Sequence, residues 1–183
     1  MASPILVGER VRLRPVEEAD AARRRRHGWH RAIQRNYGDE RPDGPMSTAE
    51  AMDWLAGIRA QDSSTFWAVE VEDDLAGVAF LHHVDEVDRR ARYAVGMFHP
   101  AFMGRGLGLE ATRLVLDHAF NGIGLHRVDL RVLAFNTAAM ASYQRAGFVI
   151  EGRERDSCRL EGTWHDDVVM AILEDEFRTQ HSR

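Results

Sequence analysis

A glycine-rich turn is the first feature of the sequence whose residue types can do chemistry. It consists of Met103, Gly104, Arg105, Gly106, Leu107 and Gly108. A strand pattern precedes it and a helical pattern follows, so the turn supplies amide N–H groups at a helix N-terminus, where the helix dipole attracts anions. Glycines also let the backbone approach a ligand closely. We therefore predict a phosphate-binding turn to which Arg105 adds a charge, with a ligand-free turn as the alternative.

Two familiar phosphate-binding patterns do not fit this turn. A dinucleotide-binding G-x-G-x-x-G motif would need its third glycine at Leu109. The Lys+Arg total of 24 consists entirely of arginine, so the lysine of a nucleotide-binding P-loop is missing. The same absence excludes enzymes that form a Schiff base through a lysine amine.

A second pair of polar side chains follows the turn. Asn136 and Tyr143 lie about two helical turns apart, so both fall on one side of a predicted helix. Asn136 can also cap that helix, which Gly147 then ends before a strand that begins at Phe148. Tyr143 is a candidate functional hydroxyl, and a core aromatic residue at helical spacing is the alternative.

The elements that position these residues follow an alternating α/β pattern. Strands are predicted at residues 11–14, 66–71, 77–84, 92–98, 127–132 and 168–173, with one more from Phe148. Helices are predicted at residues 17–27, 47–59, 105–120 and 136–145. Residues 92–132 fit a βαβ unit with two parallel strands. The sequence therefore predicts an α/β fold in one domain, residues 1–183, with a single mixed sheet flanked by helices.

Composition sets the class of protein. With 183 residues, 44% hydrophobic and 29% charged, the chain fits one globular domain and excludes a disordered or collagen-like protein. No stretch approaches the roughly 18 apolar residues of a membrane-spanning helix, and Glu9 interrupts any signal-peptide core. A net charge of -5 disfavours nucleic acid as a partner. A single cysteine fits a reducing compartment, so we expect a cytoplasmic protein that does not bind membranes.

Other charged groups have ordinary structural explanations. The arginine run at residues 23–26 fits the solvated last turn of a helix better than a nucleic-acid contact. His27 and His30 lack a third ligand at suitable spacing, so we predict no metal site. Cys158 has no histidine and asparagine in the order typical of cysteine nucleophiles, so we do not expect it to be one.

Taken together, these motifs resemble the GNAT superfamily of acyl-CoA-dependent N-acetyltransferases, in the branch of ribosomal-protein N-terminal and polyamine acetyltransferases. Residues 8–15 look like that branch's first strand. The family's (Arg or Gln)-x-x-Gly-x-(Gly or Ala) turn matches at Gly106 and Gly108, while Met103 departs from its first position. Residues 125–148 are similar to the next strand, helix and Gly-Phe element, and residues 162–166 look like the late hairpin.

The resemblance implies both a fold and a co-substrate. It implies a largely antiparallel sheet whose central parallel strands, residues 92–98 and 127–132, splay apart to admit acetyl-CoA. The glycine-rich turn would hold the pyrophosphate through main-chain N–H groups, and Phe98 and Asn136 would contact the pantetheine arm. Tyr143 would donate a proton to the departing thiolate, because a tyrosine pKa of about 10 suits a thiol pKa near 8.5.

The implied activity is direct acetyl transfer from acetyl-CoA to a primary amine. Members of the branch often carry a glutamate on the strand before the turn, where this chain has Arg92 and Tyr93. The sequence therefore does not assign the general base. His83, beside His82, is the candidate, and the alternative is that these histidines lie at a solvated hairpin end without a catalytic function. A protein N-terminal α-amine is the first expectation for the acceptor because its pKa of about 7.7–8.0 leaves much of it neutral. A polyamine or aminoglycoside-like amine is the alternative.

The resemblance also places the acceptor site in residues 17–59 and 152–166, where Trp29 and Trp54 are candidates to line it. The acids in these segments are Glu17, Glu18, Asp39, Glu40, Asp53, Glu154 and Asp156. A rival of another class is an acyl-CoA-binding regulatory module that lacks turnover. Many relatives dimerise, so the resemblance implies a homodimer as well.

Overall fold

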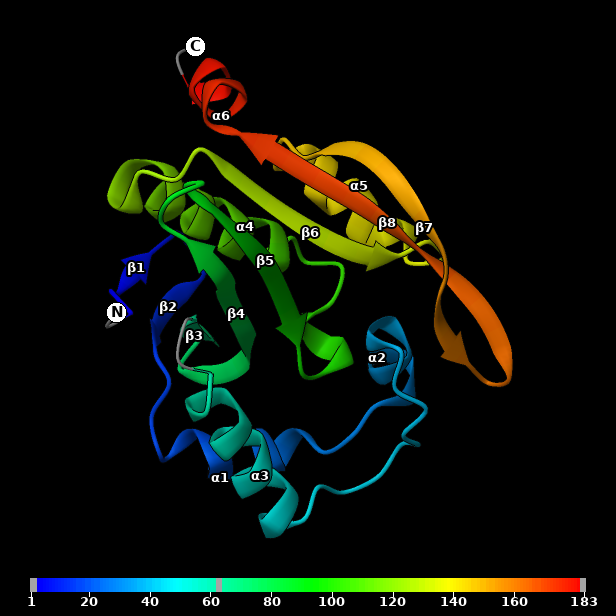
Figure 1. Cartoon of the computed structure of the whole chain (residues 1–183). Helices are drawn as coiled ribbons and strands as arrows, with labels where there is room; N and C mark the ends of the chain where they lie inside the picture. Colours follow the sequence, from blue (N-terminus) through cyan, green and yellow to red (C-terminus); the bar gives the residue numbers. More distant parts are fainter. Residues whose placement is uncertain (1–2, 62–63, 182–183) are drawn as a thin grey trace.

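One eight-stranded sheet organises the chain in this computed structural model, which describes residues 3–61 and 64–181 (Figure 1). The strand order is β1-β2-β3-β4-β5-β6-β8-β7, and every neighbouring pair is antiparallel except β5 and β6. The strands are β1 (Leu6–Val7), β2 (Arg12–Pro15), β3 (Thr65–Val71), β4 (Asp74–Asp85), β5 (Arg90–Met97), β6 (Arg127–Leu133), β7 (Val149–Leu160) and β8 (Thr163–Leu173). The predicted mixed, largely antiparallel α/β fold is confirmed.

Helices cover both faces of this sheet (Figure 1). They are α1 (Asp20–His27), α2 (Arg31–Gln34), η1 (Arg35–Tyr37), α3 (Thr48–Arg59), η2 (Pro100–Phe102), α4 (Leu107–Asp117), η3 (His118–Ile123), α5 (Thr137–Arg145) and α6 (Glu174–His181). Side chains of β3 alternate between the faces: Trp67 and Val69 join the core that includes α4, whereas Ala68 packs with Trp54 of α3. Among the described residues, no helix is long and apolar enough to cross a membrane.

The parallel pair β5 and β6 separates after a short paired stretch. Arg90, Ala91 and Arg92 pair with Arg127, Val128 and Asp129, and the pairing ends there. Helix α4 makes the crossover between the two strands, as a parallel pair requires. Figure 1 shows β5 and β6 diverging from this point. The later halves of the two strands therefore flank a gap in the sheet.

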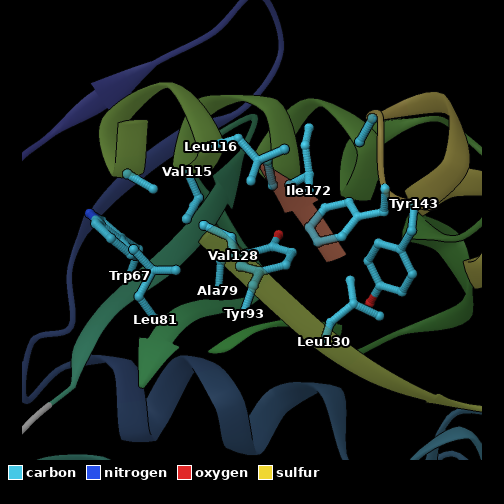
Figure 2. Packing of buried hydrophobic residues seen from close by; sticks show 14 of the residues in the cluster. Trp67, Ala79, Leu81, Tyr93, Val115, Leu116, Val128, Leu130, Tyr143 and Ile172 are labelled. Atoms are coloured by element: carbon cyan, nitrogen blue, oxygen red, sulfur yellow. The ribbon is translucent and has the colours of Figure 1, made fainter. Parts of the chain in front are cut away.

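The core on the α4 side keeps both strands in place. Figure 2 shows Trp67, Tyr93, Val128 and Leu130 in one core with Val115 of α4, and each of these side chains is at most 1% exposed. The alternation predicted for β6 is confirmed, because Val128, Leu130 and Val132 are all buried. Burial of these apolar side chains stabilises the sheet, by about 25 cal/mol per Å² of apolar surface removed from water.

Several elements differ from the sequence prediction at their ends. Strand β2 includes Pro15, which sequence reasoning placed outside it; as the last strand residue, it removes no central ladder bond. Helix α1 begins at Asp20 and not at residue 17, because the Asp20 carboxylate accepts the Glu17 amide at 2.8 Å and holds a turn there. Strand β1 and helices α2, η1 and α6 were not predicted, since two to eight residues carry too little periodicity.

Candidate active site

A cavity of about 470 Å³ occupies the gap between β5 and β6. The diverging strands line it through Ala94, Val95 and Met97 on β5 and Arg131, Val132 and Leu133 on β6. The glycine-rich turn and helix α5 line one side, and η1 and the β7–β8 hairpin line another. The cavity thus joins the two faces of the sheet at the only place in the described sheet where neighbouring strands are parallel.

The glycine-rich turn presents free amide groups to this cavity. Gly104 and Gly106 have φ of 71° and 78°, a region that only glycine adopts readily. Helix α4 begins directly after Gly106, and in the described chain the amides of residues 104–109 donate to no backbone or side-chain acceptor. A Cβ added at Gly104 would meet nothing within 4 Å, so the space beside the turn is open. The turn can therefore receive phosphate oxygens through main-chain N–H groups.

The N-terminal segment fastens this turn to helix α4. The Arg10 guanidinium donates to the Arg105 carbonyl at 2.8 Å and pairs with Glu110 at 3.1 Å. Glu110 also accepts the amides of Arg10 and Val11 at 2.8 and 3.1 Å. Burial by itself raises the pKa of Glu110, but these hydrogen bonds together lower it below its ordinary value. Glu110 is therefore a carboxylate at neutral pH, and it ties residues 10–11 to helix α4 while Arg10 holds the Arg105 carbonyl of the turn.

Helix α5 brings two predicted residues to the cavity. The Asn136 side chain accepts the Ala139 amide at 3.2 Å and so caps α5, as predicted. Tyr143 is only 9% exposed, and its hydroxyl has no hydrogen-bond partner within the part of the chain that the structure describes. Burial, and then the nearby Tyr37, raise the pKa of Tyr143 well above its ordinary value. Its hydroxyl therefore keeps its proton at physiological pH and is available to a ligand (Figure 2).

Tyr37 is a residue of the cavity that sequence reasoning missed. It comes from η1, and its hydroxyl donates to the Val95 carbonyl of β5 at 3.4 Å. A Cβ at Gly96 would lie 2.7 Å from this hydroxyl, so Gly96 permits the close approach. Although 56% of Tyr37 is exposed, its hydroxyl end lies among β5 backbone atoms, and this local burial raises its pKa to about 12. No motif of the sequence includes Tyr37.

Three predicted site residues lie outside the cavity. The Phe98 ring packs against the Arg24 guanidinium at 4.4 Å and edge-on to Trp54, and Phe98 is not among the residues that line the cavity. The Arg105 side chain points to Glu72 at 3.4 Å, and only its carbonyl belongs to the fastened turn. Trp54, a candidate to line the acceptor site, packs edge-on against the same Phe98 ring.

His83 is the third of these residues. It lines a separate surface pocket with Arg92 and Asp129, at the closed end of the β5–β6 pair. A bulge after His82 breaks the alternation of β4 there, and His83 itself has a φ of 51°. The structure therefore does not bring His83 and Tyr143 together, and the proposed base function of His83 has no support from this geometry.

The acceptor-side wall comes from two segments that contact each other. Arg31 of α2 pairs with Glu161 in the turn of the β7–β8 hairpin, and the Glu161 amide donates to Glu40 at 2.6 Å. A Cβ at Gly38 would lie 2.7 Å from the Cys158 sulfur, so the η1 end and β7 are in contact. Cys158 lines the cavity, whereas none of the seven acids noted in the sequence does. No group of three potential metal ligands occurs in the described ranges 3–61 and 64–181.

Comparison with known proteins agrees with this geometry. Residues 10–149 match the family model of the acetyltransferase (GNAT) domain. The chain belongs to the GNAT acetyltransferase family. It is therefore an acyltransferase, and GNAT acetyltransferases use acetyl-CoA as the acetyl donor.

Individual GNAT relatives extend the similarity across the chain. Spermidine N(1)-acetyltransferase of Escherichia coli K12 is 25% identical over 171 residues, covering 93% of this chain and 90% of the relative. The ribosomal N-acetyltransferase-like protein YdaF of Bacillus subtilis is 31% identical over 106 residues, covering 58% and 57%. The crystal structure of spermidine N-acetyltransferase from Vibrio cholerae with CoA and spermine covers 93% of this chain and 99% of that chain. Its TM-score of 0.78 at 23% identity shows the same fold.

Proposed function

We propose that this GNAT protein transfers the acetyl group of acetyl-CoA directly to a primary amine of a small cationic acceptor. The observation that carries the proposal is the cavity between β5 and β6, which connects the free amides of the glycine-rich turn with the opposite face of the sheet. The turn suits the phosphates of acetyl-CoA, and the gap suits its extended arm. Asn136 would contact that arm, while Phe98 has no part in it because its ring lies elsewhere.

The transfer needs three things from the chain. The neutral amine attacks the thioester carbonyl and then loses one N–H proton to solvent, the developing oxyanion needs a hydrogen-bond donor, and the C–S bond breaks as the thiolate leaves with a proton or a hydrogen bond. Backbone N–H groups on the β6 side of β5 are suited to the oxyanion, because β5 and β6 no longer pair there. Tyr143 serves the thiolate. Because burial raises its pKa, Tyr143 acts mainly as a fixed hydrogen-bond donor and gives up its proton only as the thiolate forms.

The acceptor preference departs from the first expectation. A protein N-terminal amine was expected from its low pKa, yet the comparisons give that choice no support. The Escherichia coli relative that matches over most of both chains acts on spermidine, which favours a small amine. A spermidine-like acceptor is therefore the proposed substrate class, and protein N-termini become a comparison arm in the assay.

Thiol release from acetyl-CoA tests this function. The assay would use spermidine, 1,4-diaminobutane, an aminoglycoside and N-terminal peptides as acceptors, with calorimetric binding of acetyl-CoA in parallel. Amine-dependent release with the small amines supports the proposal. Tight acetyl-CoA binding without release for any amine would instead favour a regulatory acyl-CoA-binding module.

Assembly and location are part of the same proposal. The resemblance implies a homodimer, and β7 offers an edge strand on which Val149 and Ile150 are 52% and 49% exposed. Gel filtration coupled to light scattering measures the oligomeric state directly. A cytoplasmic location is proposed because acetyl-CoA is an intracellular thioester and because the single cysteine needs no oxidising compartment.

A further inference from the structure

One carboxylate in the cavity has no partner in the part of the chain that the structure describes. Asp167 lies on β8, opposite Leu133 of β6 and Glu154 of β7. Its neighbours Val168 and Met170 are buried in the core on the α4 side. Because side chains alternate along a strand, Asp167 belongs to the opposite face, the face that carries η1 and the acceptor-side wall.

Three neighbouring acids are already engaged within the protein. Glu154 pairs with Arg131 at 2.8 Å. Asp166 accepts hydrogen bonds from the Arg153 guanidinium and the Asp156 amide, both at 3.0 Å. Asp129, on the same face as Asp167, pairs with Arg92 at 2.7 Å.

Asp167 differs from all of them. It is half-buried, and in the described ranges it takes part in no ion pair and no side-chain hydrogen bond. It is also the one acid among the described residues that line the cavity. The nearest basic residue of the lining, Arg131, is already occupied by Glu154. A half-buried carboxylate without a counter-ion has lost part of its hydration, and a cation that enters the cavity compensates for this loss by pairing with it.

We propose that Asp167 binds a non-reacting ammonium group of the acceptor and so selects amines that carry a second positive charge. This inference rests on the proposed function. The reacting nitrogen must be neutral to attack the thioester, so a permanent carboxylate partner would hinder it. A second ammonium, by contrast, gains a charge-assisted hydrogen bond at no cost to reactivity. A diamine then spans the cavity, with one nitrogen at Asp167 and the other at the gap near Tyr143.

Calorimetry on the full chain in saturating CoA tests the assignment. The probes are 1,4-diaminobutane and n-butylamine, which share a carbon chain and differ in one ammonium. For Asp167→Asn we expect diaminobutane affinity to fall at least ten-fold, with butylamine affinity and CoA affinity unchanged. Asp167→Glu should recover part of the loss. Asp129→Asn is the matched control, because that acid lies on the same face outside the cavity, and it should bind diaminobutane like the parent protein.

Each other result overturns the assignment. Equal diaminobutane affinity in the parent and in Asp167→Asn removes Asp167 from recognition, as does failure of the parent to bind diaminobutane at all. An equal loss for both amines, with kcat reduced in the transfer assay, would make Asp167 the general base. The thiol-release assay on the parent protein separates these failures from failure of the proposed function, because only the latter leaves no amine-dependent release. Melting temperatures of all three variants confirm that they are folded.

Discussion

At the scale of single residues, Tyr143 and Gly106 divide the proposed reaction between them. Gly106 shapes the phosphate-binding turn through a backbone conformation, whereas Tyr143 contributes one hydroxyl at the gap between the strands. Substitutions at the two positions should therefore have different effects. Loss of the hydroxyl should affect turnover, and loss of the turn should affect binding.

Tyr143→Phe removes the hydroxyl and keeps the ring that packs on Phe148. Because that hydroxyl has no protein partner in the described chain, we expect little change in stability or in acetyl-CoA affinity. Turnover should fall about ten-fold or more, within the range of a general-acid contribution. Steady-state kinetics and calorimetry measure the two quantities. Unchanged kcat would remove Tyr143 from the reaction.

Gly106→Glu should abolish acetyl-CoA binding. The residue has a φ of 78°, and the new side chain adds negative charge where phosphate is expected. Gly106→Ala has the same backbone strain without the charge, so it serves as the matched control and should bind more weakly than the parent but measurably. If calorimetry finds normal binding in the glutamate variant, the phosphates lie elsewhere.

At the scale of elements, a buried ion pair joins β2 to α1. Asp20 is fully buried, and both its oxygens accept from Arg14 at 2.8 Å. Arg14 also reaches Glu70 of β3 at 3.1 Å. Burial alone would raise the pKa of Asp20, but the hydrogen bonds from Arg14 and the Glu17 amide outweigh it and lower that pKa. This network fixes the helices that lead to Tyr37.

Asp20→Asn should destabilise the protein by about 3 kcal/mol, because it leaves the buried Arg14 with only part of its counter-charge. Urea denaturation followed by circular dichroism gives the free energy of unfolding. Asp53→Asn on the exposed side of α3 is the control and should change it little. If Asp20→Asn lowers the free energy of unfolding no more than Asp53→Asn does, Glu70 alone supplies the counter-charge that Arg14 needs.

At the scale of the whole molecule, half-buried histidines couple stability to pH. Burial is the main cause that lowers the pKa of His27, His82 and His118, and His82 falls to about 4. His82 faces His83, Arg92 and Asp129, and the two histidine Nδ1 atoms are 2.7 Å apart. Protonation of the His82 ring is therefore unfavourable in the folded protein.

The sign of the effect follows from proton binding. Between the lowered folded values and the ordinary histidine pKa of about 6.5, the unfolded chain binds more protons than the folded chain. Stability is therefore complete above about pH 6.5 and decreases as the pH falls toward 4. Melting temperatures should be lower at pH 5 than at pH 7.5, and His82→Gln should reduce the difference. Equal melting temperatures at pH 5 and pH 7.5 would contradict the lowered histidine pKa values.

The sequence by itself determined the features that depend on neighbouring residues. The glycine-rich turn, the helix start at residue 47, the Asn136 cap and the alternation of β6 are all local, since each involves a few consecutive positions. These features were enough to predict that the glycine-rich turn and Tyr143 lie near each other, and both line the cavity. Tertiary structure decided the rest of the cavity, because Tyr37 and Asp167 are far apart in the sequence and line the same cavity only in the folded chain. Tertiary structure also decided that Phe98 and His83 lie outside the cavity, because a strand end and a bulge determine which face a side chain takes, and neither is visible in the sequence pattern.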